Sequence, residues 1–354
     1  MIWNFGPGPA LLPDTVRERC AAALLDYEDG IGIGETSHRS PAFTRIIEDA
    51  ERRVRELLGA GDEFAVLFLP GGASLQFSML PASFLRTRGD YVVTGSWAQK
   101  AADAGAQYGE TRVVASSAVT NFDRIPDGWV SAGADYLHIC ANNTIAGTQW
   151  RDFPQHPCLL ADMSSEIMSR PLAMHDFGAI YAGAQKNLGL AGVTLVVLRR
   201  DLLATAREGQ PPMLDYNLHA TKGSRLNTPP TFAIFALRET LRWVQREGGL
   251  PEMARRCEQR SGALYETIDS SDRFYRSPIA HERDRSRLNV VFRLPTEELE
   301  AQFLRAAAER GMVGLRGHRS VGGVRASMYN AMPQAGAEAL AALMREFAAG
   351  AVGP

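Results

Sequence analysis

The stretch AIYAGAQKNLGLAGVTLVVLRR, residues 179–200, contains two apolar runs joined by a short connection. The runs AIYAGAQ (179–185) and TLVVLRR (194–200) have the length and composition of buried strands. Only eight residues separate them, whereas a parallel crossover needs about a dozen or more residues. We therefore expect these two strands to run antiparallel.

Lys186 lies directly after the first of these runs, among residues that are apolar, small or neutral. The chain has only three lysines, at positions 100, 186 and 222, against 35 arginines. A guanidinium stays protonated, whereas an ammonium that is removed from water can lose its proton and act as a nucleophile. A lysine retained here therefore predicts amine chemistry. The alternative is a surface lysine whose stem covers apolar area.

Five earlier apolar runs are also short and bounded by turn-forming residues, which predicts buried strands. Segments with helical spacing lie between them, for example at 74–85 and 97–109. Alternating strands and helices indicate an α/β fold, in which helices cover both faces of a mainly parallel, seven-stranded sheet. The five runs are FAVLFLP (64–70), YVVTG (91–95), RVVASS (112–117), YLHICAN (136–142) and CLLADMS (158–164).

The pattern changes after a long predicted helix at 231–249, which Gly248 and Gly249 close. From about residue 257 onward, two predicted strands alternate with two predicted helices in a smaller α+β arrangement. We therefore expect a large domain at 16–256 and a small domain made of 1–15 and 257–354. The predicted elements of the small domain are strands at 287–294 and 323–329 and helices at 297–311 and 334–349.

The bulk properties exclude several classes of protein. The net charge of −2 and the pI of about 6.4 give no basic footprint for nucleic acid. No CxxC pair and no HExxH motif occurs, so the sequence supports neither a zinc site nor metal catalysis. No apolar run is long enough to span a membrane, and the N-terminal residues do not resemble a signal peptide. We expect a cytoplasmic protein with reduced cysteines.

Chemically distinctive residues fall at the carboxyl ends of the predicted strands, where parallel sheets bind ligands. Lys186 follows one of these strands, Asp162 falls within the end of a second, and Thr144 follows a third. The segment GGASLQF (71–77) opens a helix, whose N-terminal N–H groups can bind an anion. One cofactor, pyridoxal phosphate (PLP), satisfies all of them: its aldehyde suits the lysine, its ring nitrogen the carboxylate and its phosphate the helix start.

Each residue also has a simpler interpretation. Asp162 could cap a following helix, and GGAS could form only a tight turn. Trp97 could be a core aromatic, and Thr144 alone says little. The order and spacing of the set carry the PLP hypothesis, because the anion-binding turn, the aromatic residue, the aspartate and the lysine follow one another in the chain.

Six motifs together resemble the phosphoserine aminotransferases, a family of fold-type I PLP enzymes in the aspartate-aminotransferase superfamily. They extend from the first residues almost to the last, so the resemblance covers essentially the whole chain. It implies a PLP-dependent transamination between O-phospho-L-serine and 2-oxoglutarate, and often also 4-phosphohydroxy-L-threonine as a substrate. The motifs are NFGPGPALLP (4–13), SHRSPAF (37–43), PGGASLQF (70–77), YAGAQKNLG (181–189), NTPPTF (227–232) and GHRSVGGVRASMYNAM (317–332).

The resemblance also implies which residues hold the cofactor. Lys186 would bond covalently to its aldehyde, and Asp162 would hold the proton on its ring nitrogen. Trp97 would stack on the ring, and Thr144 would bond near it. Three residues of the same chain would bind the cofactor phosphate, and two would reach the phosphate of a partner subunit, which implies a homodimer with shared sites. These are Ala73, Ser74 and Gln185, and then Asn227 and Thr228.

The substrate residues implied by the resemblance are basic. Arg325 would bind the α-carboxylate, and two His-Arg pairs would bind the anionic tail. Arg binds carboxylate and phosphate bidentately, and His adds a donor whose charge can adjust to the substrate. The alternative is that the pairs are surface charge clusters. The pairs are His38 with Arg39 and His318 with Arg319.

The chain departs from the family pattern at two places. Ala73-Ser74 stands where many members have Gly-Arg, and Pro7 stands where many have Ser or Ala. The contacts that those side chains make in other members therefore cannot be carried over.

Other functions remain as alternatives. Another fold-type I aminotransferase, such as an alanine–glyoxylate aminotransferase, is the nearest. A cysteine desulfurase would need a cysteine on a mobile loop, and none lies at 310–330. GIGIGE (30–35) could suggest a dinucleotide site, but it follows a helical stretch rather than a strand. A PLP-binding protein with a regulatory or scaffolding role is a further alternative.

Overall fold

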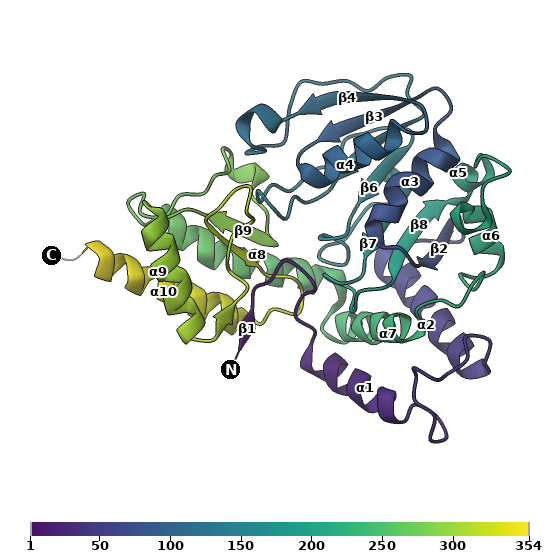
Figure 1. Ribbon diagram of the computed structural model, residues 1–354, viewed down its shortest axis with the longest axis horizontal. Helices are drawn as coiled ribbons and strands as arrows, with labels where there is room; N and C mark the ends of the chain where they lie inside the picture. Colours follow the sequence, from purple (N-terminus) through teal and green to yellow (C-terminus); the bar gives the residue numbers. More distant parts are fainter. Residues whose placement is uncertain (1, 353–354) are drawn as a thin grey trace.

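The computed structural model describes residues 2–352 and contains a seven-stranded sheet. Its strand order is β2-β8-β7-β6-β5-β3-β4. All seven strands correspond to apolar runs in the sequence, so the predicted α/β class and strand number are confirmed (Figure 1). The strands are β2 (Phe64–Leu69), β3 (Arg88–Val93), β4 (Glu110–Ser116), β5 (Tyr136–Cys140), β6 (Leu159–Asp162), β7 (Ala179–Gly183) and β8 (Thr194–Arg199).

Strand β8 is the antiparallel member of the sheet, as the short connection predicts. It pairs antiparallel with β7 on one side and with β2 on the other. The remaining neighbours, from β7 across to β4, pair in parallel. The carboxyl ends of β5, β6 and β7 therefore lie at the same edge of the sheet.

The prediction that every strand is buried is wrong for β4. This strand lies at the end of the sheet and has β3 as its neighbour on one side only. Its residues are exposed or half-buried, and Val113 is 45% exposed. A run of β-branched residues indicates a strand but not its place in the sheet, because that place depends on the pairing of distant segments.

Helices cover both faces of the sheet, since successive strand residues point to opposite sides. Val66 and Ile139 belong to the core on one face, and Leu67 and Tyr136 to the core on the other. The first face is covered by α1 (Asp14–Leu25), α2 (Pro41–Leu58) and α7 (Thr231–Arg246). The second is covered by α3 (Gly72–Phe84), α4 (Ser96–Gly105), α5 (Arg200–Ala204) and α6 (Tyr216–Thr221).

The C-terminal part and the first residues build a smaller α+β unit beside the sheet (Figure 1). Its two short sheets pair β1 with β10 in parallel and β9 with β11 antiparallel. Within residues 2–352, four one-turn 3₁₀ segments lie between these elements, at Ala118–Thr120, Met174–Asp176, Pro212–Leu214 and Glu282–Asp284. The elements of the unit are β1 (Trp3–Asn4), α8 (Gly249–Asp269), β9 (Asn289–Phe292), α9 (Glu297–Glu309), β10 (Met312–Val313), β11 (Val324–Ser327) and α10 (Gln334–Val352).

We propose the division into a large domain at 16–256 and a small domain at 1–15 and 257–354. The hydrophobic clusters support it. The two cores that flank the sheet draw their buried residues from Val16 to Met253, and the third core draws them from Phe5 and from Leu264 to Met344. Helix α8 passes through the proposed boundary, so it would join the two domains.

The predicted long helix ends as its glycines suggest. Helix α7 stops at Arg246, and Gly248 follows in the left-handed region with φ 108°. This backbone conformation favours glycine because a Cβ would be strained there. Helix α8 then starts at Gly249. None of the helices among residues 2–352 is both long and apolar enough to cross a membrane.

Candidate active site

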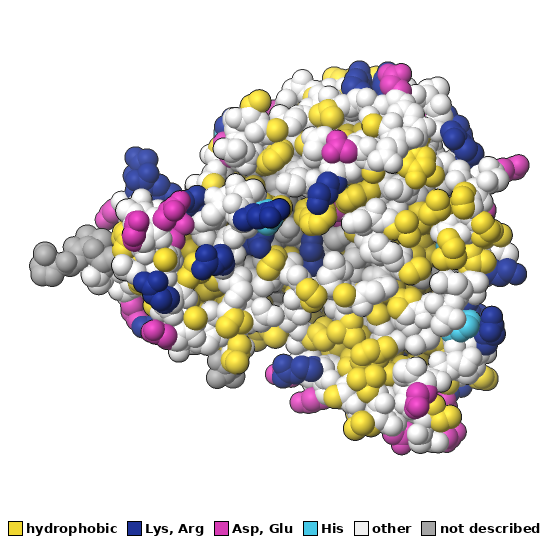
Figure 2. Space-filling model, in the orientation of Figure 1, with side chains coloured by type: hydrophobic (Ala, Val, Ile, Leu, Met, Phe, Trp, Pro, Cys, Tyr) yellow, Lys and Arg dark blue, Asp and Glu magenta, His cyan; other side chains and the backbone are white. Residues whose placement is uncertain are grey.

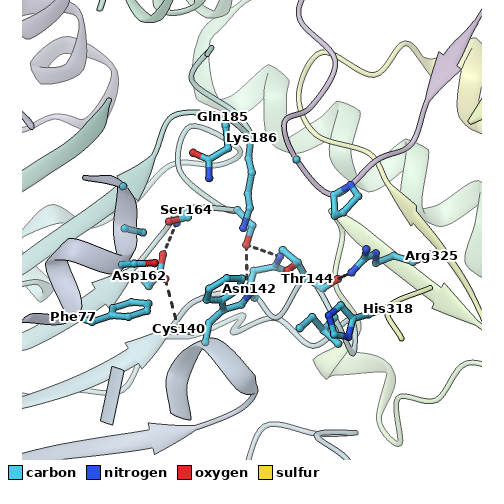
Figure 3. A pocket seen from close by; sticks show the side chains of 18 residues that line it. Phe77, Cys140, Asn142, Thr144, Asp162, Ser164, Gln185, Lys186, His318 and Arg325 are labelled. Atoms are coloured by element: carbon cyan, nitrogen blue, oxygen red, sulfur yellow. Dashed lines mark hydrogen bonds between the residues drawn. The ribbon is translucent and has the colours of Figure 1, made fainter. Parts of the chain in front are cut away.

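A cavity of about 380 Å³ lies at the carboxyl ends of the central strands, between the sheet and the C-terminal unit (Figure 3). Both parts of the chain contribute to its wall, because it lies where the ends of β5, β6 and β7 meet the loop before β11. Nine of the residues predicted from the sequence line it. They are Ala73, Ser74, Trp97, Thr144, Asp162, Gln185, Lys186, His318 and Arg325.

Asp162 ends strand β6 and places its carboxylate in the cavity. Its Oδ1 accepts a hydrogen bond from the Ser164 N–H at 2.9 Å. The thiol of Cys140 lies 4.0 Å from Oδ2. Residues after Asp162 form turns rather than an α-helix, so the interpretation of this residue as a helix cap is wrong.

Lys186 follows strand β7 and also lines the cavity. Burial lowers the pKa of its ammonium, while the carboxylate of Asp162 opposes that shift. Burial likewise raises the pKa of Asp162, and the charge of Lys186 opposes that shift. The two groups thus stabilise each other's charge in a site that disfavours charge, and the interpretation of Lys186 as a surface lysine is wrong.

The N-terminal segment packs against the stem of Lys186. Gly8, with φ 129°, approaches so closely that an added Cβ would lie 3.2 Å from Cγ of Lys186. The N–H of Ala10 donates to the Gln185 carbonyl at 2.8 Å, which fixes this segment beside the lysine. The lysine chain therefore has little freedom, and its amine is directed into the cavity.

One end of the cavity is the start of helix α3. Gly71 caps this helix and Gly72 begins it, with φ 93° and 68°. Among the described residues, no side chain caps the first turn of this 13-residue helix. Its N–H groups at Ala73 and Ser74 therefore face the cavity with the positive end of the helix dipole, which favours a bound phosphate.

The opposite side of the cavity carries Arg325 from strand β11. Its Nη1 donates to the Thr144 carbonyl at 2.9 Å, and the residue is 6% exposed. Nε is buried and finds no hydrogen-bond partner within residues 2–352. A buried guanidinium with an unused donor and no carboxylate partner is suited to bind a carboxylate ligand.

His318 lies on the loop before β11 and forms the mouth of the cavity together with Trp97. Its Nδ1 and the Ser320 hydroxyl lie 2.7 Å apart. Burial lowers the pKa of His318, and the nearby positive charges of Arg325 and Arg319 lower it further. Arg319 itself is exposed and does not line the cavity.

The remaining predicted residues lie elsewhere on the same chain. His38 is buried, whereas Arg39, Asn227 and Thr228 are exposed, and none of the four lines the cavity. The two segments that carry them lie side by side, because Arg225 donates to the hydroxyl of Thr44 at 2.9 Å.

Several residues that line the cavity carry no functional motif in the sequence. Among them is Asn142, whose Nδ2 donates to the Ser165 hydroxyl at 2.9 Å and to Oδ1 of Asn289 at 2.7 Å. Its position as the last residue of a predicted strand is the only signal that could have indicated it. No signal of this kind marks Phe77 or Cys140, because their place in the wall depends on contacts between distant segments, such as the packing of α3 on β7 that brings Phe77 against Tyr181. The unassigned lining residues include Phe77, Cys140, Asn142, Ser164 and Ser165.

The donor set fits PLP. The cavity brings together an amine, a carboxylate and a free helix N-terminus, which match the aldehyde, ring nitrogen and phosphate of this cofactor. Trp97, which is 36% exposed, supplies an aromatic surface at the mouth. The orphaned Nε of Arg325 adds a place for a substrate carboxylate.

Comparison with known proteins agrees with this chemistry. Residues 2–340 match the family model described as aminotransferase class-V. A phosphoserine aminotransferase from Geobacillus kaustophilus (strain HTA426) is 50% identical over 352 residues, which cover 98% of each chain.

Solved structures show the same relationship. A phosphoserine aminotransferase from Bacillus circulans subsp. alkalophilus is 42% identical, with a TM-score of 0.96 over 99% of both chains. A PLP-bound phosphoserine aminotransferase from Trichomonas vaginalis is 35% identical, with a TM-score of 0.92 over 98% of this chain and all of the other (100%). This chain therefore belongs to the class-V aminotransferases, within the phosphoserine aminotransferase family.

Proposed function

We propose that this chain is a PLP-dependent transaminase that interconverts O-phospho-L-serine and 2-oxoglutarate with 3-phosphohydroxypyruvate and L-glutamate. The observation that carries the proposal is the cavity itself. It holds an amine and a carboxylate at its centre, a phosphate-binding helix start at one end and a buried arginine on the opposite side. The two amino-acid substrates share an α-amino acid head and an anionic tail, so one such cavity can accept both.

When bound, PLP supplies an electron sink that stabilises negative charge on the substrate Cα. Residues of the chain transfer the proton and hold the cofactor in place. Lys186 is the base that removes the proton from Cα, and burial helps because it lowers the pKa of the amine. Asp162 keeps a proton on the ring nitrogen of the cofactor. Ala73 and Ser74 hold the cofactor phosphate through their N–H groups.

The proposed substrate contacts divide by position. Arg325, deep in the wall, binds the α-carboxylate that every amino-acid substrate carries. His318, at the mouth, and Arg319, on the same loop, bind the anionic tail. A phosphate dianion gains more from the charge of Arg319 than the monoanionic carboxylate of glutamate does, and His318 adds a hydrogen-bonding group. This difference gives the preference for phosphoserine.

The direct test is a half-reaction screen of the PLP-loaded enzyme. Phosphoserine and glutamate should each convert the cofactor to its aminated form, followed as loss of the visible absorption band, and alanine should react much more slowly. An enzyme that reacts readily with alanine and not with phosphoserine would instead be an alanine–glyoxylate type aminotransferase. 4-Phosphohydroxy-L-threonine belongs in the same screen, because we propose it as a second substrate.

The division of roles predicts different effects of two arginine substitutions. Arg319→Ala should lower kcat/KM about ten- to a hundredfold for phosphoserine, less for glutamate and hardly at all for alanine, since charge-assisted hydrogen bonds contribute about 1.5–3 kcal/mol. Arg325→Ala should lower kcat/KM for all three substrates to a similar extent. Half-reaction rates on three substrates measure both effects. Equal slowing of alanine and phosphoserine by Arg319→Ala would show that Arg319 does not bind the tail.

We also propose that the enzyme is a homodimer with shared active sites. The support is that Asn227, Thr228 and the His38-Arg39 pair do not line the chain's own cavity, and that a hydrogen bond between Arg225 and Thr44 holds the two segments that carry them together. In a symmetric dimer, such a surface can complete the cavity of the partner. There Asn227 and Thr228 would bind the cofactor phosphate.

Shared sites predict that two inactive variants complement each other. A Lys186→Ala subunit is mixed with a subunit carrying both Asn227→Ala and Thr228→Ala. The hybrid dimer then has one site with both defects and one site with none, so about a quarter of wild-type activity should return after random re-pairing. If each chain completes its own site, both hybrid sites remain defective and no activity appears.

Three further points concern the desulfurase alternative, the cellular compartment and a regulatory role. A desulfurase role is disfavoured because Cys140, at the cavity wall, has a pKa raised well above its usual range by burial and by Asp162. Such a thiol stays protonated and is a poor nucleophile.

We place the enzyme in the cytoplasm, where its four cysteines, all buried and free, would stay reduced. Turnover in the half-reaction screen distinguishes an enzyme from a PLP-binding protein with a purely regulatory role.

A further inference from the structure

Lys100 has no part in the proposed reaction, yet it lies beside the cavity. It follows Trp97 by one turn on helix α4, and its Nζ lies 4.4 Å from the centroid of the Trp97 ring. Trp97 belongs to the cavity wall. The ammonium is therefore held against the aromatic surface that forms one side of the mouth.

The aromatic contact keeps the charge of Lys100 available. A tryptophan face attracts an ammonium without neutralising it, whereas a carboxylate partner would cancel its charge. Asp103, one turn further along α4, accepts a hydrogen bond from Gln99 at 2.7 Å. Lys100 is one of only three lysines in a chain that otherwise uses arginine for positive charge.

The charge of Lys100 also acts across the mouth. It is one of three positive charges, with Arg325 and Arg319, that lower the pKa of His318 on the opposite side. Figure 2 shows Lys and Arg side chains gathered with a histidine near the middle of the face it presents. Cations from α4 and from the loop before β11 thus converge where the tail of a bound substrate would lie.

We propose that Lys100 is a specificity-determining residue that helps select a phosphate dianion over a carboxylate at the mouth of the cavity. The inference rests on the proposed function and adds to it a residue outside the two His-Arg pairs. An ammonium is a compact, hydrated point charge. The attraction between the ammonium and the substrate grows with the charge of the tail, so it favours phosphoserine over glutamate. It does not affect alanine, which has no charged tail.

The experiment measures half-reaction rates of the PLP-loaded enzyme with phosphoserine, glutamate and alanine for three variants. Lys100→Met removes the charge but keeps an unbranched apolar stem, and Lys100→Arg keeps the charge. Arg305→Met removes one charge from an exposed position on α9, away from the cavity, and serves as the control.

Lys100→Met should lower the ratio of kcat/KM for phosphoserine to that for glutamate by about two- to fivefold, since exposed ion pairs are partly screened by water. The rate on alanine and the absorption spectrum of the bound cofactor should stay unchanged. For Lys100→Arg the ratio should stay close to that of the wild type, and for Arg305→Met it should be unchanged. The difference between wild type and Lys100→Met should shrink at high salt.

Two results would overturn the inference. In one, Lys100→Met leaves the phosphoserine-to-glutamate ratio unchanged. In the other, it slows all three amino acids equally and alters the cofactor spectrum, which would mean that Lys100 only supports Trp97. Failure of the proposed function is recognised separately, because the wild-type enzyme would then show no reaction with phosphoserine.

Discussion

Lys186→Ala should reduce turnover by at least about 10²–10⁴-fold, the usual effect of removing a general base. The loss should exceed that range, because the same amine also anchors the cofactor. The fold should remain, since Lys186 is a cation in a site that disfavours charge, and its removal leaves Asp162 free to take up a proton. Turnover and the melting temperature Tm are measured on the same preparation.

Chemical labelling gives an independent check on Lys186. Borohydride reduction of the PLP-loaded wild-type enzyme, followed by peptide mapping, should place the pyridoxyl group on Lys186. The other two lysines, Lys100 and Lys222, serve as internal controls in the same digest. A label on either of them would contradict the assignment.

Asp162→Ala should lower kcat by about 10²–10³-fold, comparable to the loss of one preorganised electrostatic group in other enzymes. The carboxylate stabilises positive charge on the ring nitrogen, and alanine cannot. If the main role of Asp162 were instead its hydrogen bond to the Ser164 N–H, the cost would be about 1 kcal/mol of folding stability with turnover intact. Measuring kcat and Tm on this one variant separates the two roles.

A matched control for Asp162→Ala is Asp201→Ala. Asp201 is an exposed aspartate whose Oδ1 likewise accepts a hydrogen bond from a nearby backbone N–H, that of Leu202 at 2.6 Å. It lies at the start of α5, outside the cavity wall, so its removal should affect stability slightly and kcat not at all. A similar loss of kcat in both variants would contradict a specific role for Asp162.

The parts of the fold that sequence could predict depend on local patterns. The antiparallel place of β8 followed from eight connecting residues, which is too short a path for a parallel crossover. Lys186 stood out because it is a rare residue type in an apolar stretch. Both inferences needed only neighbours in the chain.

The parts that sequence could not predict depend on distant pairings. The exposure of β4 follows from its place at the end of the strand order. The contact of Arg325 with the Thr144 carbonyl joins residues 181 positions apart. Its role came from the family resemblance, and its burial and orphaned Nε came only from the structure. Lys100 likewise gave no signal in the sequence beyond the scarcity of lysine.

The junction between the sheet and the C-terminal unit is polar as well as buried. The side-chain oxygen of Asn142 accepts from the Ser286 hydroxyl at 2.5 Å, while its nitrogen donates to Asn289. The nitrogen of Asn289 in turn donates to the Ser327 hydroxyl at 2.9 Å. Each buried amide is thus matched to partners supplied by the other unit or by its own sheet.

This matching restricts how the chain can be recombined. In a chimera that takes its sheet from this protein and its C-terminal unit from a relative without Ser286 or Asn289, the buried groups of Asn142 would lose their partners. Each unmatched group would cost about 1–3 kcal/mol, next to the wall that carries Arg325. Crossovers are therefore best tolerated where Asn142 and Asn289 are inherited from the same parent.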